Sequence, residues 1–336
     1  MSAGLRFAAV IVNYNGGRML SESVRSCARE GIPPTQIVVV DNGSRDGSIE
    51  ELGRQIAGLK LVRNSCNAGF ARAVNQGICQ TEAEFILLLN NDAQLAGGAL
   101  SAFAEGFDLR PKLAIAGARL LHPDGRLQSS FAPLPSAAEE LLPPPLLRLL
   151  APDRFRRKTA QAEPMAVESV FGACLSVRAG VLPRLGLLDE DFFFFYEEVE
   201  WCQRARRMGF EVWFLPAARV VHGWGVTANR FRGPARVEYQ RSKLTFFRKT
   251  RSRASYRVVS SFLVVRTLVD ALAGTVACLA TLFLNSRLRK KAATYCYLLW
   301  WHIRLRPAHW GLPDKCPRGG GGIREREPAP TAGADG

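Results

Sequence analysis

Short apolar runs alternate with amphipathic stretches over the first hundred residues, and turn-forming or polar residues separate them. The apolar runs occupy residues 7–12, 36–40, 59–63 and 84–89, which is typical of strands buried on both faces. Helical spacing of apolar residues marks the segments between them, at 19–30, 49–56 and 70–79. Strands that alternate with helices in this way predict an α/β fold with a mostly parallel sheet flanked by helices.

Polar side chains gather at one end of the predicted strands. Asn13, Asp41 and Asp92 each follow the carboxyl end of an apolar run. In open α/β sheets ligands bind in the crevice outside these ends, so we expect the three residues to share one site. The first strand is not followed by GxGxxG and the chain has no Walker A motif, which disfavours dinucleotide binding and P-loop chemistry.

The pattern changes in the second half of the chain. Residues 122–167 are proline-rich with a basic cluster at 154–158, and we interpret them as a variable insertion. An apolar run follows at 169–178. A helix that begins with acidic residues is predicted within 187–207, and two further strands are predicted to end near residue 215 and at His222. We therefore expect one domain over residues 1–235 that contains this insertion.

The net charge of +15 belongs to a C-terminal segment. Residues 236–306 hold fifteen Lys and Arg against only Glu238 and Asp270. The apolar run 258–284 is interrupted only by Arg266 and Asp270, which are four residues apart and could pair on a helix. Cations and aromatics beside apolar helices favour an anionic membrane surface, so 236–310 is predicted to be a helical membrane-associating extension. The low-complexity residues 311–336 are predicted to be a disordered tail.

Two other classes of protein fit less well. The basic charge alone would suit nucleic acid, but no helix-turn-helix, RRM or KH signature accompanies it, so we expect no nucleic-acid partner. The eight cysteines lack metal-clip spacing, and the N-terminus lacks the features of a signal peptide. We therefore expect reduced thiols and a cytoplasmic protein that is peripheral at the inner face of the cell membrane.

Six motifs occur in order: IVNYNG, VVVDNGSRDGS, NAGFARAVNQG, LLLNNDA, FGACLSVR and FFFFYEEVEWCQRARRMGF. Together they resemble the family 2 glycosyltransferases of the GT-A fold, and their rhamnosyltransferase-like bacterial branch in particular, over about residues 7–250. The resemblance implies a GT-A catalytic domain and an inverting transfer of rhamnose or another hexose. The implied donor is a UDP- or dTDP-sugar, and the implied acceptor is a saccharide or polyprenyl-linked glycan in cell-envelope polysaccharide synthesis.

The resemblance also implies residues that bind the nucleotide-sugar. Asp41 would accept a hydrogen bond from the base, although an Asx turn is the common role for an Asp at a strand end. Gly69 would let the backbone approach the nucleotide, and Arg72 could contact a phosphate. The complete set of candidate donor-binding residues is Asn13, Tyr14, Asp41, Asn67, Gly69, Arg72 and Asn91.

A metal site is implied where Asn90, Asn91 and Asp92 occupy the place of the family's DxD motif. Asp92 is the candidate ligand for Mg²⁺ or Mn²⁺, which would neutralise the diphosphate leaving group. Asn90 departs from the motif because it is neutral. His222 is a second candidate ligand, and a structural histidine is the equal alternative.

The general base is expected at the start of the acidic-led helix. Glu198 matches the family's catalytic Asp with one extra methylene, and Glu197 and Glu200 are nearby alternatives. Acidic residues also favour helix N-termini for purely structural reasons, but the preceding FFFFY is apolar enough to raise the pKa of a carboxyl group. Because Asn90 and Glu198 both depart from the family pattern, a catalytically inactive nucleotide-sugar-binding scaffold is the alternative.

Overall fold

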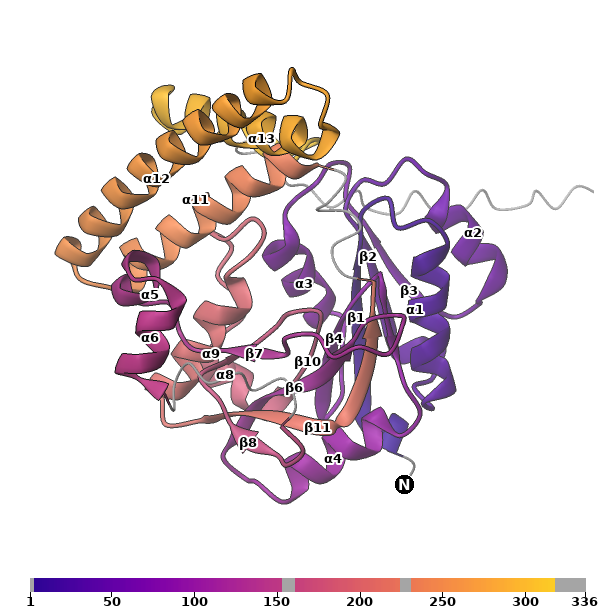
Figure 1. The fold of residues 1–336 in the computed structure, drawn as a ribbon. Coiled ribbons are helices and arrows are strands. Elements are labelled where there is room, and N and C mark those ends of the chain that lie inside the picture. The colour runs from indigo at the N-terminus through magenta and orange to yellow at the C-terminus, as the bar shows by residue number, and fades with distance from the viewer. Residues whose placement is uncertain (1–2, 153–160, 224–230, 318–336) are drawn as a thin grey trace, which may run out of the picture.

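The computed structural model describes residues 3–152, 161–223 and 231–317 (Figure 1). Within them nine strands form one sheet, and two more form a separate ribbon. The sheet contains β1 (Phe7–Asn13), β2 (Ile37–Asp41), β3 (Lys60–Arg63), β4 (Phe85–Asn90), β5 (Ala93–Leu95), β6 (Leu113–Leu121), β8 (Met165–Ala166), β10 (Cys174–Arg178) and β11 (Glu211–His222). The ribbon pairs β7 (Phe131–Ala132) with β9 (Ser169–Val170).

The sheet order is β3-β2-β1-β4-β10-β6-β11-β5, with β8 also pairing with β11. The four strands predicted from the first apolar runs are parallel neighbours, and β6 and β11 form another parallel pair. Antiparallel β10 joins these two parts, since it pairs with both β4 and β6. The predicted α/β sheet flanked by helices is thus confirmed, while the direction of β10 could not follow from apolar runs alone.

Helices cover both faces of the sheet and extend beyond it. They are α1 (Arg18–Arg29), α2 (Ser48–Gln55), α3 (Phe70–Ile78), α4 (Ala99–Asp108), α5 (Ala137–Leu141), α6 (Pro144–Leu150), α8 (Leu182–Leu185), α9 (Glu197–Arg207), α11 (Arg232–Thr250), α12 (Arg253–Ala280) and α13 (Ser286–Ile303).

Alternation along the strands builds two apolar cores. In β1, Phe7, Ala9 and Ile11 belong to the cluster that includes side chains of α1, α2 and α4. Val10 and Val12 belong to the cluster that includes α3, α8 and α9. Successive strand residues point to opposite faces, so a strand that is apolar at every position needs helices on both sides.

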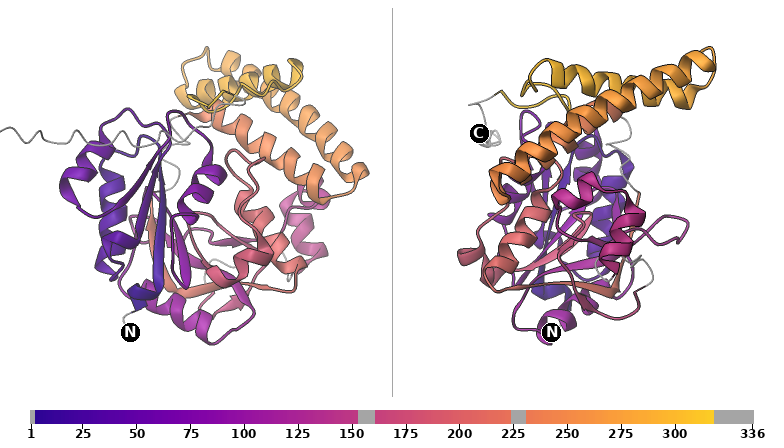
Figure 2. Two further views of the ribbon diagram at one scale, coloured as in Figure 1. Left: turned by 180° about the vertical axis from the view of Figure 1, so that it is seen from behind. Right: turned by 60° about the vertical axis from the view of Figure 1, so that its left-hand side comes forward.

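The predicted helical extension is formed by α11, α12 and α13, and Figure 2 shows it lying across one end of the sheet domain. A third apolar cluster joins this extension to the segment before α9, through Phe192 and Tyr196 on one side and Val237 and Phe246 on the other. In α12, Arg266 and Asp270 lie 3.9 Å apart, as their spacing predicted.

The insertion 122–167 contains β7, α5, α6 and β8. The Ser136 hydroxyl accepts from the Glu139 amide and the Glu139 carboxylate accepts from the Ser136 amide, a capping box that starts α5. Helix α5 packs against α12, so the insertion contacts the helical extension. The predicted basic cluster at 154–158 lies outside the described residues.

Two expectations about the C-terminus are wrong. The segment Trp310–Cys316, which we call the C-terminal strap, packs back onto the sheet domain, so the predicted disordered tail does not begin at residue 311; residues 318–336 of that predicted tail lie outside the described residues. Cys316 forms a disulfide with Cys66 rather than remaining a reduced thiol. The two cysteines are 250 residues apart in sequence, and only the path of the strap brings them together.

Candidate active site

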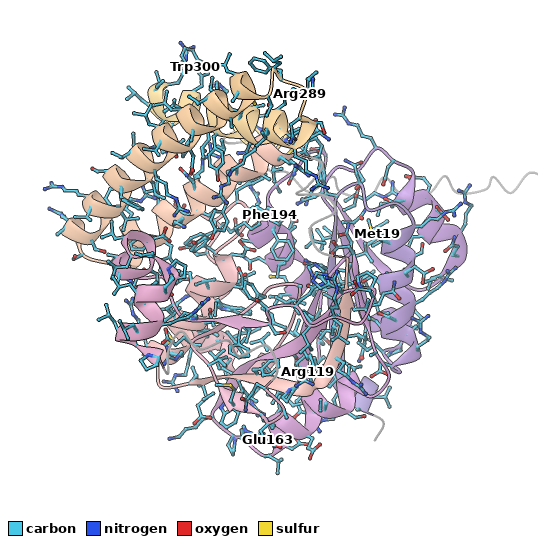
Figure 3. All side chains as sticks on the ribbon, viewed as in Figure 1. Met19, Arg119, Glu163, Phe194, Arg289 and Trp300 are labelled. Atoms are coloured by element: carbon cyan, nitrogen blue, oxygen red, sulfur yellow. A yellow bond between two sulfur atoms is a disulfide. The ribbon has the colours of Figure 1, made fainter. Side chains whose placement is uncertain are left out.

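A cavity of about 650 Å³ opens between the carboxyl ends of the first strands and the start of α9. Asn90, Asn91 and Asp92 line it, and so do Glu197 and Glu198. Aromatic side chains from 193–196 line it as well, and Figure 3 shows Phe194 between the sheet and the helical extension. Polar groups from both halves of the domain therefore meet in one space.

Asn13 is the centre of a buried hydrogen-bond network behind this cavity. Its Nδ2 donates to the hydroxyls of Ser44 and Ser48 at 3.0 Å and to Asp41 at 3.4 Å. Its Oδ1 accepts from Asn91 Nδ2 at 3.0 Å. Burial raises the pKa of Asp41, while hydrogen bonds from Ser44 act against this shift. The ends of β1, β2 and β4 are thus linked at one edge of the sheet, but neither Asn13 nor Asp41 is among the described residues that line the cavity.

Asn67 and Gly69 lie where the chain enters α3. Gly69 has a φ of +91°, and a Cβ there would lie 2.8 Å from both the ring and the carbonyl oxygen of Phe193. A side chain would therefore be strained and would also displace the Phe193 segment. Asn67 Oδ1 accepts from the Gly69 amide at 3.1 Å and from Asn42 at 3.2 Å. Asn67 and Asn42 line the cavity; Asn42 was not among the candidates, although it follows Asp41 directly.

Arg72 lies elsewhere. Its guanidinium lies 3.9 Å from the Glu190 carboxylate, and Arg72 is not among the cavity-lining residues that the structure describes. Asn75, one turn further along α3, donates to Glu190 at 3.0 Å and to the carbonyl oxygen of Leu188 at 2.9 Å. This face of α3 thus holds the 188–190 segment, and the structure does not bring Arg72 to the other donor-site candidates.

The two candidate metal ligands meet across β5 and β11. His222 pairs with Ala93, the residue after Asp92, and His222 Nε2 lies 3.3 Å from Asp92 Oδ1. Both side chains are almost fully buried and line the cavity. The structure therefore brings together residues 130 positions apart that were predicted separately.

Gln128, which sequence reasoning missed, fixes the tautomer of His222. Its Nε2 donates to the carbonyl oxygens of His222 at 2.7 Å and Leu121 at 3.1 Å, so its Oε1 must face His222 Nδ1, 3.1 Å away. Nδ1 then carries the proton, and the lone pair of Nε2 in a neutral imidazole faces the carboxylate of Asp92. Two acceptors in that arrangement suit a cation bound between them.

A carboxylate oxygen and an imidazole nitrogen suit Mg²⁺ or Mn²⁺, so the donor set fits a divalent cation. Within the described ranges, no group of three or more His, Cys, Asp and Glu side chains could enclose a metal ion. Asp92 and His222 would thus supply a partial site that needs oxygen ligands from a bound molecule.

Three acidic residues at the start of α9 have different surroundings. Glu200 pairs with Arg204 at 2.8 Å, away from the cavity. Glu198 Oε1 accepts from the Gly172 amide at 3.3 Å, and within the described residues neither Glu198 Oε2 nor Glu197 Oε2 has a hydrogen-bond partner. Burial raises the pKa of Glu198, and burial together with the charge of Glu198 raises that of Glu197.

The backbone before α9 is strained. Phe195 and Tyr196 both have a φ of +71°, the left-handed region that bulky residues rarely occupy. Each such residue costs on the order of 1–3 kcal/mol. The packing of Tyr196 against Tyr239 and Phe246 holds this conformation and directs the start of α9 toward the cavity.

Three comparisons with known proteins bear on this arrangement. The model of the family described as glycosyl transferase family 2 matches residues 8–179. The N-acetylglucosaminyl-diphospho-decaprenol L-rhamnosyltransferase of Mycobacterium tuberculosis is 25% identical over 228 residues, 63% of this chain and 74% of that protein.

Two solved structures share the GT-A fold that the sequence predicted. The mannosyltransferase PcManGT from Pyrobaculum calidifontis, in complex with GDP-Man and Mn²⁺, matches with a TM-score of 0.51 and 16% identity, covering 89% of this chain and 86% of that one. GalNAc-T7, with UDP, GalNAc and Mn²⁺, matches with a TM-score of 0.51 and 17% identity, covering 93% of this chain and 59% of that one.

Proposed function

The chain belongs to glycosyl transferase family 2, and we propose that it moves rhamnose or another hexose, with inversion, from a UDP- or dTDP-sugar to a saccharide or polyprenyl-linked glycan. The observation that carries this proposal is that the Asp92–His222 pair and the buried Glu198 line the same cavity. The name of the mycobacterial relative, a rhamnosyltransferase acting on a diphospho-decaprenol-linked sugar, supports this acceptor class and a role in cell-envelope polysaccharide synthesis.

Asp92 and His222 would hold Mg²⁺ or Mn²⁺ together with the donor diphosphate. The cation would neutralise the charge of the departing nucleotide diphosphate. The Mn²⁺ bound in both solved structures supports a divalent cation. Asn91, fixed by Asn13, lies between this pair and the network that contains Asp41 and would orient the nucleotide-sugar.

Glu198 would act as the general base. The Gly172 amide occupies Oε1, which leaves Oε2 to accept the proton of the acceptor hydroxyl. The acceptor oxygen then forms its bond to the anomeric carbon as the bond from that carbon to the diphosphate breaks on the opposite face. One displacement of this kind inverts the configuration.

We also propose that the helical extension lies on the inner face of the cell membrane. Helix α12 is the one helix in the described chain that is long and apolar enough to cross a membrane. Its buried stripe packs on protein, and the opposite stripe exposes apolar side chains at Val265, Leu268, Val269, Leu272 and Val276. A helix with one face packed on its own domain fits a surface position better than a span.

Basic and aromatic side chains extend this exposed face. Arg287, Arg289, Lys290 and Lys291 are exposed on α13, and Figure 3 shows Arg289 and Trp300 on the outer side of the extension.

Flotation with vesicles tests the proposed membrane association. We expect the protein to float with anionic vesicles but not with neutral ones, and a Leu272→Asp variant to lose flotation. A Leu109→Asp control on the sheet domain, equally exposed and apolar, should still float. Equal flotation with neutral vesicles would contradict the proposed attraction of the basic side chains to anionic lipids.

Turnover tests the catalytic proposal. The protein would be incubated with Mn²⁺, a panel of UDP- and dTDP-sugars and polyprenyl-diphosphate-linked saccharide, with the products analysed by mass spectrometry and NMR. We expect one donor to be consumed and the new linkage to have inverted configuration. Nucleotide binding without transfer from any donor would instead indicate the inactive scaffold, and a product of retained configuration would contradict the mechanism.

A further inference from the structure

The C-terminal strap comes from beyond the helical extension and ends against the sheet domain. Asn67 donates its amide proton to the Asp314 carbonyl at 2.7 Å, and the Cys316 amide donates to the Asn67 carbonyl at 3.1 Å. Asn67 and Lys315 thus form a parallel β-bridge. A candidate donor-binding residue is therefore held by a segment more than 240 positions further along the chain.

Helix α11 anchors the other edge of the strap. Glu238 is fully buried, pairs with Arg241 at 2.6 Å and with Lys315, and accepts from the Leu312 amide at 3.1 Å. A buried carboxylate with two cations and a backbone donor is well satisfied, and removing a partner would be costly. The strap is thus held on both sides by contacts that do not involve its disulfide.

Two strap side chains face residues already assigned to donor binding. The Tyr14 hydroxyl donates to Asp314 Oδ2 at 2.7 Å. Leu312 is only 7% exposed and lines the same cavity as Tyr14, Asn42 and Asn67. Lys315 Nζ lies 4.6 Å from the ring centroid of Phe193, the residue that packs on Gly69.

We propose that the C-terminal strap forms one wall of the subsite for the donor nucleotide, with Leu312 contacting the nucleoside and Asp314 positioning Tyr14. This inference rests on the proposed function and adds a segment outside the region that the family model matches. The ligand class is a nucleoside diphosphate. Its base has flat apolar faces that a leucine and a tyrosine ring can cover, while its edge hydrogen-bonds to polar groups such as that of Asn42, which lines the cavity.

The strap also connects donor binding with the membrane-associating helices. It follows α13 after the short connection 304–309, and Glu238 on α11 holds it in place. Cys66 and Cys316 form a disulfide in the structure, whereas the proposed cytoplasmic location favours thiols. All tests are therefore run with excess dithiothreitol, which donates two electrons and two protons to the protein disulfide, is oxidised to its own cyclic disulfide, and leaves Cys66 and Cys316 as thiols.

Calorimetric titration with UDP and dTDP in the presence of Mn²⁺ tests the role of Leu312. Leu312→Ala removes this side-chain contact and should weaken the affinity for the nucleotide that the wild type binds more tightly by about three- to tenfold. Leu147→Ala is the matched control, because Leu147 is also 7% exposed and lies in α6 away from the cavity. It should bind as the wild type does. Equal affinity of Leu312→Ala and wild type, with both folded, would overturn the proposal.

The Asp314–Tyr14 contact is tested by a double-mutant cycle. Asp314→Ala and Tyr14→Phe should each weaken nucleotide binding by about two- to fivefold, because the hydrogen bond is exposed at Asp314. The double variant should be no worse than either single variant, and Asp314→Asn, which retains an acceptor oxygen, should bind as the wild type does. Fully additive losses or failure of the Asn rescue would contradict positioning by Asp314. If the wild type binds no nucleotide, the proposed function fails instead, so the two failures are distinguishable.

Discussion

Replacing Glu198 with glutamine isolates the proposed proton transfer from the rest of the site. The amide keeps the shape of the side chain, and its Oε1 can still accept from the Gly172 amide as the carboxylate does at 3.3 Å. The substitution removes the basic oxygen, Oε2, which has no hydrogen-bond partner among the described residues. Binding of the donor at Asp92 should not change.

The expected loss follows from the role of a general base. Removing a positioned base costs about 10²- to 10⁴-fold in rate, or roughly 3–5 kcal/mol of activation free energy. The substitution should not lower the stability of the folded protein and is expected to raise it. Because burial raises the pKa of Glu198, the ionised carboxyl is costly at neutral pH, and the neutral glutamine avoids that cost. We therefore expect a large fall in kcat with an unchanged or higher Tm.

Steady-state transfer, nucleotide calorimetry and thermal unfolding would be measured on the same preparation. Glu200→Gln is the matched control, because Glu200 lies two residues away on α9 but pairs with Arg204 outside the cavity. It should retain its kcat and lose a little stability. If Glu198→Gln kept more than about a tenth of the wild-type kcat, the assignment of the base would be refuted. A fall in nucleotide affinity equal to the fall in kcat would likewise refute it.

Further predictions concern the metal pair, the second buried carboxyl and the entry to α3. Gln128→Leu, which removes the partner of His222 Nδ1, should weaken Mn²⁺ binding by about 10- to 100-fold in calorimetry; unchanged affinity would argue against a metal role for His222. Burial raises the pKa of Glu197, so the neutral carboxyl favours the folded state. This contribution to stability is complete at pH values below the ordinary carboxyl pKa and is lost as the pH rises through the raised pKa. Glu197→Gln should therefore have a higher Tm than wild type near about pH 8, with the difference vanishing near about pH 4 in thermal scans. Gly69→Ala should lose about 1–3 kcal/mol in denaturant unfolding, because its φ is +91° and a Cβ would meet Phe193; an unchanged midpoint would show that the segment relaxes freely.

Much of the sheet and of its polar edge could be predicted because those signals are local. An apolar run followed by Asn13, Asp41 or Asp92 marks the carboxyl end of a strand, and parallel strands bring these ends together. The expected pairing of Arg266 and Asp270 also held, since it depends only on helical spacing.

The remaining features depend on contacts between distant segments. Arg72 follows a motif that suggests a phosphate contact, but Glu190, 118 positions later, is its observed partner. Gln128 carries no motif, and its role arises only because β6 and β11 are neighbours. The strap lies within the predicted tail, and its order depends on contacts with Glu238 and Asn67, which no local pattern connects with it.

Thermal-shift titration of nucleotide diphosphates with and without Mn²⁺ or Mg²⁺, on the wild type and Asp92→Ala in parallel, tests the central claim most directly. We predict that UDP or dTDP raises the Tm of the wild type only when the metal is present, and that Asp92→Ala loses this effect while remaining folded. Well-folded wild-type protein that no nucleotide stabilises, or an Asp92→Ala variant that keeps the full metal-dependent shift, would contradict the account.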